Sequence, residues 1–191
     1  MPAPDALPWT GDAEANRLLA HDPNALLIGF ALDQQVTVQK AFAGPMELRR
    51  RLGHLDPGRI AATDPDELAE VFKAKPAIHR FPGAMAQRVQ ALCADISDRF
   101  GGDGGRVWSE AATGQELVER IGSLPGFGDM KVRSLTATLI KQFGVKPAGW
   151  EKVLPNHPTL GDADSPEALE AYQAAKRAHK AEMRARKAAR A

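Results

Sequence analysis

Apolar residues recur at spacings of three and four along most of this 191-residue chain, and no stretch alternates apolar and polar residues as a half-buried strand would. The pattern is clearest in residues 84–100, which a glycine-rich run then ends. Val89, Leu92 and Ile96 would share one face of a helix there. Proline and glycine divide the rest of the chain into similar segments. This periodicity predicts an all-α fold.

Capping residues and prolines place the expected helices. An acidic cap predicts one helix over residues 22–40, and a short helix is expected over 45–52. Another should begin at 64–67, where an Asp cap, a Pro and two acids complement the helix dipole. The prolines of 145–165 predict a loop, and a final helix is expected from residue 165 onward.

The composition limits the class of protein. A hydrophobic content of 43% and the chain length favour one main domain, residues 1–164, followed by an appendage, residues 165–191. No apolar run is long enough to cross a membrane, and residues 1–12 do not resemble an export signal, so we expect a soluble cytoplasmic protein.

The single cysteine, Cys93, limits the cofactors that the chain can bind. It excludes an internal disulfide, a four-cysteine zinc site and a cysteine-ligated iron–sulfur cluster within this chain. We therefore expect no cofactor and no metal. Cys93 itself should be a buried apolar residue on the helix of residues 84–100.

The formal net charge is only +1, but basic residues gather near the carboxyl end. From residue 176 onward the only acidic residue is Glu182. The basic residues there are Lys176, Arg177, Lys180, Arg184, Arg186, Lys187 and Arg190. Such a run predicts a helix or tail that seeks phosphate groups. The alternative is an alanine-rich, solvated helix whose charges serve solubility.

Residues 115–143 form the most informative segment, because two amphipathic helices flank the turn Leu-Pro-Gly-Phe-Gly at 124–128. Gly126 and Gly128 can take backbone angles closed to other residues, and they let peptide N–H groups approach an anion closely. The second helix starts directly afterwards, so its unpaired N–H groups and positive dipole end face the same place. A phosphate group is the natural ligand.

The residues around this turn support the same interpretation. Lys131 and Arg133 would add salt-dependent attraction to a phosphate, while Leu124 and Phe127 would pin the turn against the two helices. Such contacts hold a nucleic-acid backbone and read no base sequence. The alternative is an ordinary helix–helix turn in which Pro-Gly only breaks the chain.

With these motifs, residues 22–145 resemble the helix-hairpin-helix base-excision DNA glycosylase superfamily (HhH-GPD, endonuclease III-like). The hairpin at 124–128 carries the resemblance most strongly, and residues 26–36 look like the superfamily's early helix with its Gln-rich turn. The helix of 84–100 also sits where that family has a long helix. The resemblance implies a short, cluster-free member with a reduced second subdomain, which binds double-stranded DNA and flips a damaged or mismatched base into a cleft.

The resemblance extends the expected DNA contacts to a glutamine pair that would fill or probe the vacated position, unless it is only a solvated helix end. The residues expected to bind DNA are Gln34, Gln35, Gly126, Phe127, Gly128, Met130, Lys131 and Arg133.

The chain departs from the family pattern at the catalytic carboxylate, an Asp that usually follows the second hairpin helix. No Asp stands there, and Glu151 is nearest in register, with Asp162 and Asp164 later and Asp33 beside the glutamine pair. The expected catalytic residues are therefore Glu151, Asp33 or Asp162. Asp33 could equally be a capping or solvated carboxylate.

The attacking lysine of bifunctional members would fall at Met130, and Lys131 is one residue further on, rotated by about 100° on a helix. Lys131 therefore suits phosphate contact better than nucleophilic attack, which favours monofunctional base excision.

These observations predict a monomeric, nucleoid-associated DNA repair protein acting as an N-glycosyl hydrolase. A catalytically inactive module that senses damaged DNA is the alternative, because the usual Asp is missing. A weaker alternative is a hairpin used for protein contacts. The base or lesion is left open, since it depends on the shape of the pocket.

Overall fold

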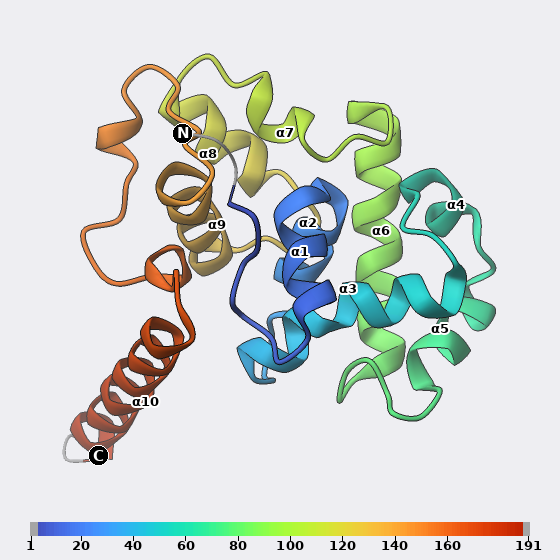
Figure 1. Ribbon diagram of the computed structural model, residues 1–191, viewed down its shortest axis with the longest axis horizontal. Coiled ribbons are helices and arrows are strands. Elements are labelled where there is room, and N and C mark those ends of the chain that lie inside the picture. Colours follow the sequence, from blue (N-terminus) through green and yellow to red (C-terminus); the bar gives the residue numbers. More distant parts are fainter. Residues whose placement is uncertain (1–3, 189–191) are drawn as a thin grey trace.

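The computed structural model describes residues 4–188, and this part of the chain is helical without a β-strand (Figure 1). The prediction of an all-α fold is therefore confirmed. In chain order, with η1 and η2 as 3₁₀ turns, the elements are α1 (Ala13–His21), α2 (Pro23–Leu32), α3 (Val38–Leu52), α4 (Pro57–Ala62), α5 (Pro65–Lys73), α6 (Pro82–Phe100), α7 (Arg106–Ser109), α8 (Gly114–Gly122), α9 (Asp129–Lys141), η1 (Trp150–Lys152), η2 (Leu160–Asp162) and α10 (Pro166–Ala188).

Six helices, α1 to α5 and α8, begin where a side chain accepts hydrogen bonds from the unpaired N–H groups of the first turn. The capping side chains are those of Asp12, Asp22, Thr37, Asp56, Asp64 and Thr113. The helix start expected at 64–67 is confirmed by the Asp64 cap of α5. Local sequence thus decides where most of these helices start.

The single helix expected over 22–40 is instead two helices, so that prediction is wrong. α2 ends at Leu32, and the chain turns through Gln35, whose φ of 55° lies in the left-handed region. The Thr37 hydroxyl then caps the start of α3. A glutamine in this backbone region carries no glycine or proline signal, which is why the break was not predicted.

α3 also differs from prediction in its second half. It runs without interruption through Pro45, so the short helix expected over 45–52 is not a separate element. A residue inside a helix normally donates its N–H to the preceding turn. Proline lacks this N–H, and so it usually breaks a helix. Pro45 is buried within α3, and the helix continues past it to Leu52.

The core is centred on α2, which is buried on every side from Ala25 to Leu32. A helix that is apolar all round needs neighbours on all faces, and α1, α3 and α6 pack against it. Trp9, Phe30 and Phe42 form an edge-to-face aromatic cluster with ring centroids 4.8–6.1 Å apart. This cluster joins the segment before α1 to the centre of the molecule.

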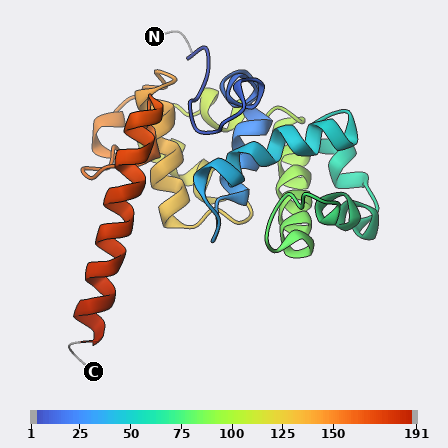
Figure 2. The same ribbon diagram turned by 60° about the horizontal axis from the view of Figure 1, so that its bottom comes forward.

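The remaining helices form two groups on either side of α2 (Figure 1). α4 and α5 pack on α6, whereas α8 and η2 pack on α9. Figure 2 shows that the turn between α2 and α3 and the loop between α8 and α9 lie on the same side of the molecule. The two parts of the chain that resemble DNA-contacting motifs are therefore neighbours.

The segment after α9 is mainly loop, as its prolines predicted, with η1 and η2 as its short turns. The final helix is also confirmed, since α10 begins at Pro166 and continues to Ala188. Arg190 lies outside the described residues. No helix in the described part of the chain is long and apolar enough to span a membrane.

Candidate nucleic-acid interface

The hairpin loop, residues 123–128, is held from inside by its two apolar residues. Leu124 and Phe127 are 2% and 6% exposed, and the N–H of Phe127 donates to the carbonyl of Leu124 at 3.2 Å. Gly126 has a φ of 82°, which is the conformation that the turn requires of a glycine. The expected anchoring by Leu124 and Phe127 is confirmed.

α9 begins without a side-chain cap, as do α6 and α7 but unlike α1 to α5 and α8. Its N-cap is Gly128, and among residues 4–188 no acceptor takes a hydrogen bond from the N–H groups of Gly128, Asp129 or Met130. An ideal Cβ at Gly128 would meet no atom within 4 Å, and Gly128, Asp129 and Met130 line an open concavity. Unpaired N–H groups at the positive end of a helix dipole are suited to bind an anion.

Arg88 on α6 joins the hairpin to the turn after α2. Its side chain lies against Gly126, where an added Cβ would be 2.9 Å from Arg88 Cδ. Its Nη1 donates to the Oε1 of Gln34. The sequence analysis missed Arg88, because both of its partners are far away in the chain and nothing in α6 marks this arginine as different from its polar neighbours.

His79 contacts the backbone of the Gln34 turn. The sequence analysis did not identify this histidine either. Its ring is 1% exposed, Nδ1 accepts from the N–H of Phe81 at 3.0 Å, and Nε2 is 3.0 Å from the carbonyl oxygen of Gln34. Because Nδ1 accepts, Nε2 carries the proton and donates. Burial lowers the pKa of His79, despite the hydrogen bonds to the Gln34 and Leu32 backbone that favour its charged form. The ring is therefore a neutral, fixed support.

Lys131 points inward rather than toward the open side of the hairpin. Its Nζ donates to the carbonyl of Ala31 at 2.8 Å and so satisfies an unpaired group at the end of α2. Burial, and then the charge of Arg88, lower the pKa of Lys131 to about 8, against the opposing charge of Asp33. In this arrangement Lys131 ties α9 to α2, and Arg133 is the exposed cation of the first turns of α9.

Of the three candidate catalytic carboxylates, only Asp33 lies with the hairpin. It is half-buried at the carboxyl end of α2, directly before Gln34. Burial raises the pKa of Asp33 above its usual value, while the charges of Lys176 and Lys131 oppose that rise. No ion pair joins Lys131 and Asp33 within the described residues, since Lys131 Nζ donates to the Ala31 carbonyl.

Asp162 is engaged at the opposite end of α9. It accepts from Lys141 Nζ at 2.5 Å and from Thr159 in a capping box at the start of η2. Burial alone would raise the pKa of Asp162, but the hydrogen bonds from Lys141 and Thr159 hold it below its usual value. The 13 residues of α9 separate Asp162 from the hairpin by about 18 Å, so the structure does not bring it to the predicted DNA contacts.

Glu151 is also remote from the hairpin. It is exposed in η1, which packs against the start of α8. α8 and α9 are joined by the hairpin loop, so the start of α8 lies at the far end of this helix from the loop. Neither Glu151 nor Asp162 is brought together with the predicted DNA contacts.

Two exposed apolar residues flank the Gln34 turn. Met130 is 67% exposed beside the unpaired N–H groups, and Phe81 is 41% exposed next to His79. Among the described residues the large exposed hydrophobic side chains are these two and Met183. Apolar side chains beside a polar turn are suited to insert between unstacked bases.

Met130 also lines an open groove of about 630 Å³ between the hairpin, α6 and the α2–α3 turn. Its lining residues are Gln34, Arg88, Leu124, Gly126, Phe127, Gly128, Asp129, Met130 and Lys131. Asp129, in the first turn of α9, is the one acid among them. Gln34 and most of the predicted hairpin contacts therefore do meet in one groove.

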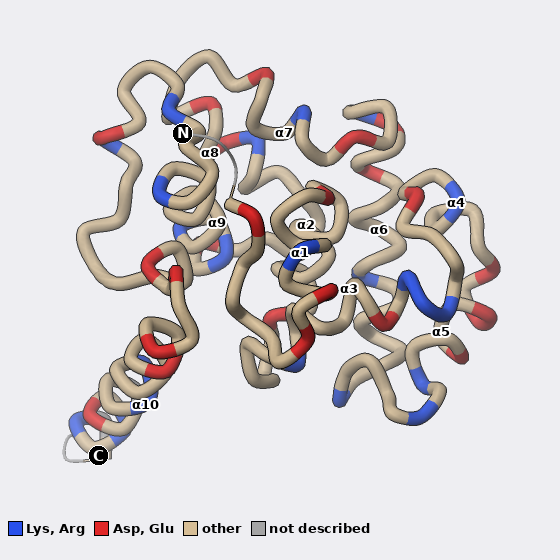
Figure 3. Tube along the Cα trace, viewed as in Figure 1, with Lys and Arg blue, Asp and Glu red and all other residues tan. Residues whose placement is uncertain are grey.

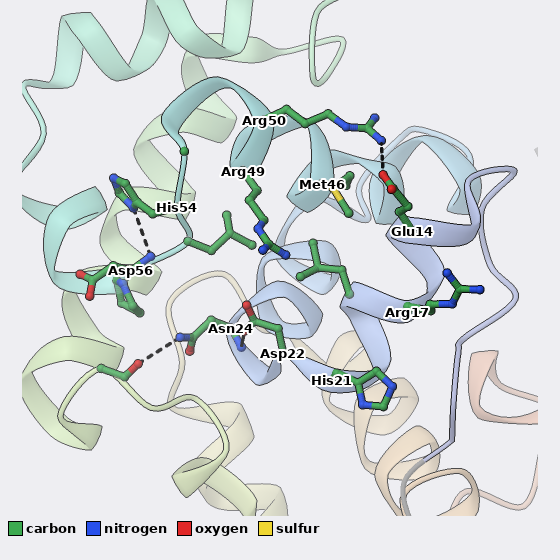
Figure 4. Close-up of a pocket in the computed structure, with 15 residues that line it drawn as sticks. Glu14, Arg17, His21, Asp22, Asn24, Met46, Arg49, Arg50, His54 and Asp56 are labelled. Atoms are coloured by element: carbon green, nitrogen blue, oxygen red, sulfur yellow. Dashed lines mark hydrogen bonds and ion pairs between the residues drawn. The ribbon is translucent and has the colours of Figure 1, made fainter.

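A second concavity of about 960 Å³ lies between α1, α3 and the start of α4 (Figure 4). Arg17 and Arg49 line it, but so do Asp22, Asp56 and Glu14. Asp22 and Asp56 cap helices, and Glu14 pairs with Arg50 at 3.1 Å. Its balanced charges suit a polyanion less than the hairpin groove does.

The remaining chemistry of the chain is limited. No three His, Cys, Asp or Glu residues in the described part of the chain come close enough to hold a metal ion. Cys93 is buried, as expected, and burial raises the pKa of its thiol to about 12. Comparison with protein-family models and with curated proteins finds no match to this sequence, so the geometry of the groove carries the functional argument.

Proposed function

We propose that this protein binds duplex DNA through its helix-hairpin-helix, as the resemblance to HhH-GPD glycosylases implies. The observation that carries the proposal is the uncapped start of α9 at Gly128, where three N–H groups without a partner among the described residues belong to residues that line the groove. A DNA phosphate would accept these hydrogen bonds and sit at the positive end of the helix dipole. Such a contact holds any sequence equally.

The groove beside the hairpin suits recognition of a damaged base. With a phosphate held at Gly128, the turn that carries Gln34 and the apolar side chains of Phe81 and Met130 would face the bases. A lesion or mismatch costs less to unstack than a normal pair, by part of the few kcal/mol that flipping requires. The protein would therefore pause at sites where the duplex is already weak.

Asp33 is the carboxylate that we assign to base excision. As the bond between the sugar C1′ and the base nitrogen breaks, positive charge develops on the sugar, and a nearby carboxylate stabilises it. Water then supplies a hydroxyl to C1′ and a proton to the departing base. Asp33 directly precedes Gln34, which lines the groove, whereas Glu151 and Asp162 lie in η1 and η2, away from it.

The DNA-binding proposal is tested by Gly128→Val. The backbone φ of −86° and the empty surroundings of Gly128 accommodate valine, so the fold should be kept while the new methyl groups cover the N–H donors. We expect affinity for any duplex to fall about tenfold, the value of a hydrogen bond to a charged group. Gly11→Val is the matched control, because Gly11 also has empty surroundings and lies outside the groove.

Binding that is absent, or insensitive to added salt, would leave the protein-contact alternative as the better account of the hairpin.

Excision is tested with duplexes that carry single lesions, followed by alkali to cut abasic sites. Asp33→Asn should abolish base release and keep DNA binding, whereas Glu151→Gln should leave both unchanged. If no duplex of the panel loses a base with the unmodified protein, the inactive damage sensor is the correct description.

Borohydride should trap no covalent adduct, because the Lys131 amine is directed to Ala31. An adduct that Lys131→Gln removes would instead make the protein a lyase.

A further inference from the structure

We propose that the outer part of α10, residues 174–188, is an arm that grips the DNA backbone beside the hairpin. This inference rests on the proposed DNA binding, because the arm would act on the duplex that the hairpin holds. It concerns a part of the chain outside the region of residues 22–145 that resembles the glycosylases.

The first part of α10 is fixed to the body of the protein. Leu169 is 3% exposed, and the side-chain amides of Gln173 and Gln39 exchange two hydrogen bonds of 2.8 and 3.3 Å. From Ala174 onward, every side chain that the structure describes is exposed. The arm therefore leaves a firm base and makes no contribution to the core.

Charge is the main property of the arm (Figure 3). Lys176, Arg177, Arg184 and Arg186 are exposed on it, against the single acid Glu182, which pairs with Arg186 at 2.6 Å. Most of the other residues are alanines, which favour the helix and do not hinder close approach. A slim helix with cations on several sides fits a polyanion.

The position of the arm favours the hairpin's own ligand. Gln173 bonds to Gln39 in the first turn of α3, which places the base of the arm beside the α2–α3 turn. Figure 2 shows α10 running past the hairpin end of α9 and projecting beyond it. The 15 residues of the arm extend for about 21 Å at 1.5 Å per residue, enough to lie along one side of a duplex that rests on the hairpin.

A membrane surface fits the arm less well. Helices that lie on membranes bury a face of Trp, Phe or Leu among the lipids, and basic charge alone holds them weakly. On the arm, the only large exposed hydrophobic side chain described is Met183. Because the arm is basic and has no apolar face, a nucleic-acid backbone is the ligand that fits it better.

The test compares two charge variants of the full chain on a duplex of about 20 base pairs, two helical turns. The arm variant is Lys176→Gln, Arg177→Gln and Arg184→Gln, since glutamine keeps helix propensity. The control variant is Arg17→Gln, Arg49→Gln and Arg59→Gln, which removes equal charge from α1, α3 and α4. At about 0.9 per phosphate contact, we expect the slope of log K against log salt to fall by up to about 2.7 in the arm variant if all three cations contact phosphates, with a smaller change in the control.

The outcomes separate this inference from the proposed function. If Gly128→Val weakens binding but the arm and control variants behave alike, the arm inference is overturned and the hairpin proposal stands. If the arm variant loses binding and Gly128→Val does not, the arm is supported and the hairpin proposal fails. If the unmodified chain does not bind the duplex at low salt, both the arm inference and the hairpin proposal are overturned. An arm variant that loses only its attachment to anionic lipid vesicles also overturns the inference.

Discussion

The His79 ring accepts the Phe81 N–H at Nδ1 and donates from Nε2 to the Gln34 carbonyl. A second proton on the ring would turn Nδ1 into a donor that faces another donor. The turn that carries Gln34 therefore depends on an uncharged imidazole. A change of pH can therefore act on the groove through this support of Gln34.

The lowered pKa of His79 predicts a pH-dependent stability. Below its ordinary value of 6.5 the unfolded chain binds a proton that the folded ring resists, so the free energy of unfolding falls as pH drops from 7.5 toward 5.5. The slope from one histidine is at most about 1.4 kcal/mol per pH unit. Urea unfolding of His79→Gln should show a shallower decline. Burial also lowers the pKa of His54, so the same measurement on His54→Gln separates the contribution of His54 to the decline from that of His79. An unchanged decline in His79→Gln would contradict the prediction.

Substitution of Asp129 should strengthen DNA binding, whereas most substitutions in a binding site weaken it. Its carboxylate lies in the first turn of α9, beside the N–H groups proposed to hold a phosphate. Asp129→Asn should strengthen DNA binding about threefold, as expected for removing one like charge several ångströms away in water. The same change should cost about 0.3–1 kcal/mol of stability, because the acid complements the helix dipole. Affinity and unfolding measured on one sample test both; weaker binding would place the phosphate elsewhere.

At the scale of the element, the two hairpin glycines have different roles. Gly126 has a positive φ and lies under Arg88, so alanine is strained there and collides with that side chain. We expect Gly126→Ala to lower the free energy of unfolding by about 1–3 kcal/mol. Gly128→Ala should change it by less than about 0.5 kcal/mol, because its surroundings are empty. Urea unfolding of the pair checks this, and equal losses would refute the distinction.

The hairpin could be predicted from sequence because its signals are local. Leu124, Phe127 and the two glycines stand within five residues, and their spacing alone fixes which side is buried. Arg88 and His79 could not, since their contacts with Gln34 span 54 and 45 residues. The position of the candidate carboxylates could not be predicted for the same reason: register in the chain favoured Glu151, whereas Asp33 directly precedes Gln34, which lines the groove.

At the scale of the whole molecule, Trp9 links the two ends of the chain. Its Nε1 donates to the carbonyl of Ala163 at 2.8 Å across 154 residues, directly before the segment that leads into α10. Trp9→Phe keeps an aromatic ring in the cluster and removes this donor from a buried carbonyl. We expect a loss of about 1–3 kcal/mol in the free energy of unfolding. A change below about 0.5 kcal/mol would mean that Gln142, whose amide also reaches this carbonyl at 3.4 Å, carries the contact.

The burial of Cys93 has a practical consequence for following the arm on DNA. With its sulfur enclosed and a thiol pKa of about 12, the native cysteine should stay inert to thiol-directed dyes while the protein is folded. A new cysteine at the exposed Ala188 would then be the single labelling site, with no need to replace Cys93. Energy transfer from that position to a dye on the duplex would report, molecule by molecule, whether the tip of α10 closes on bound DNA.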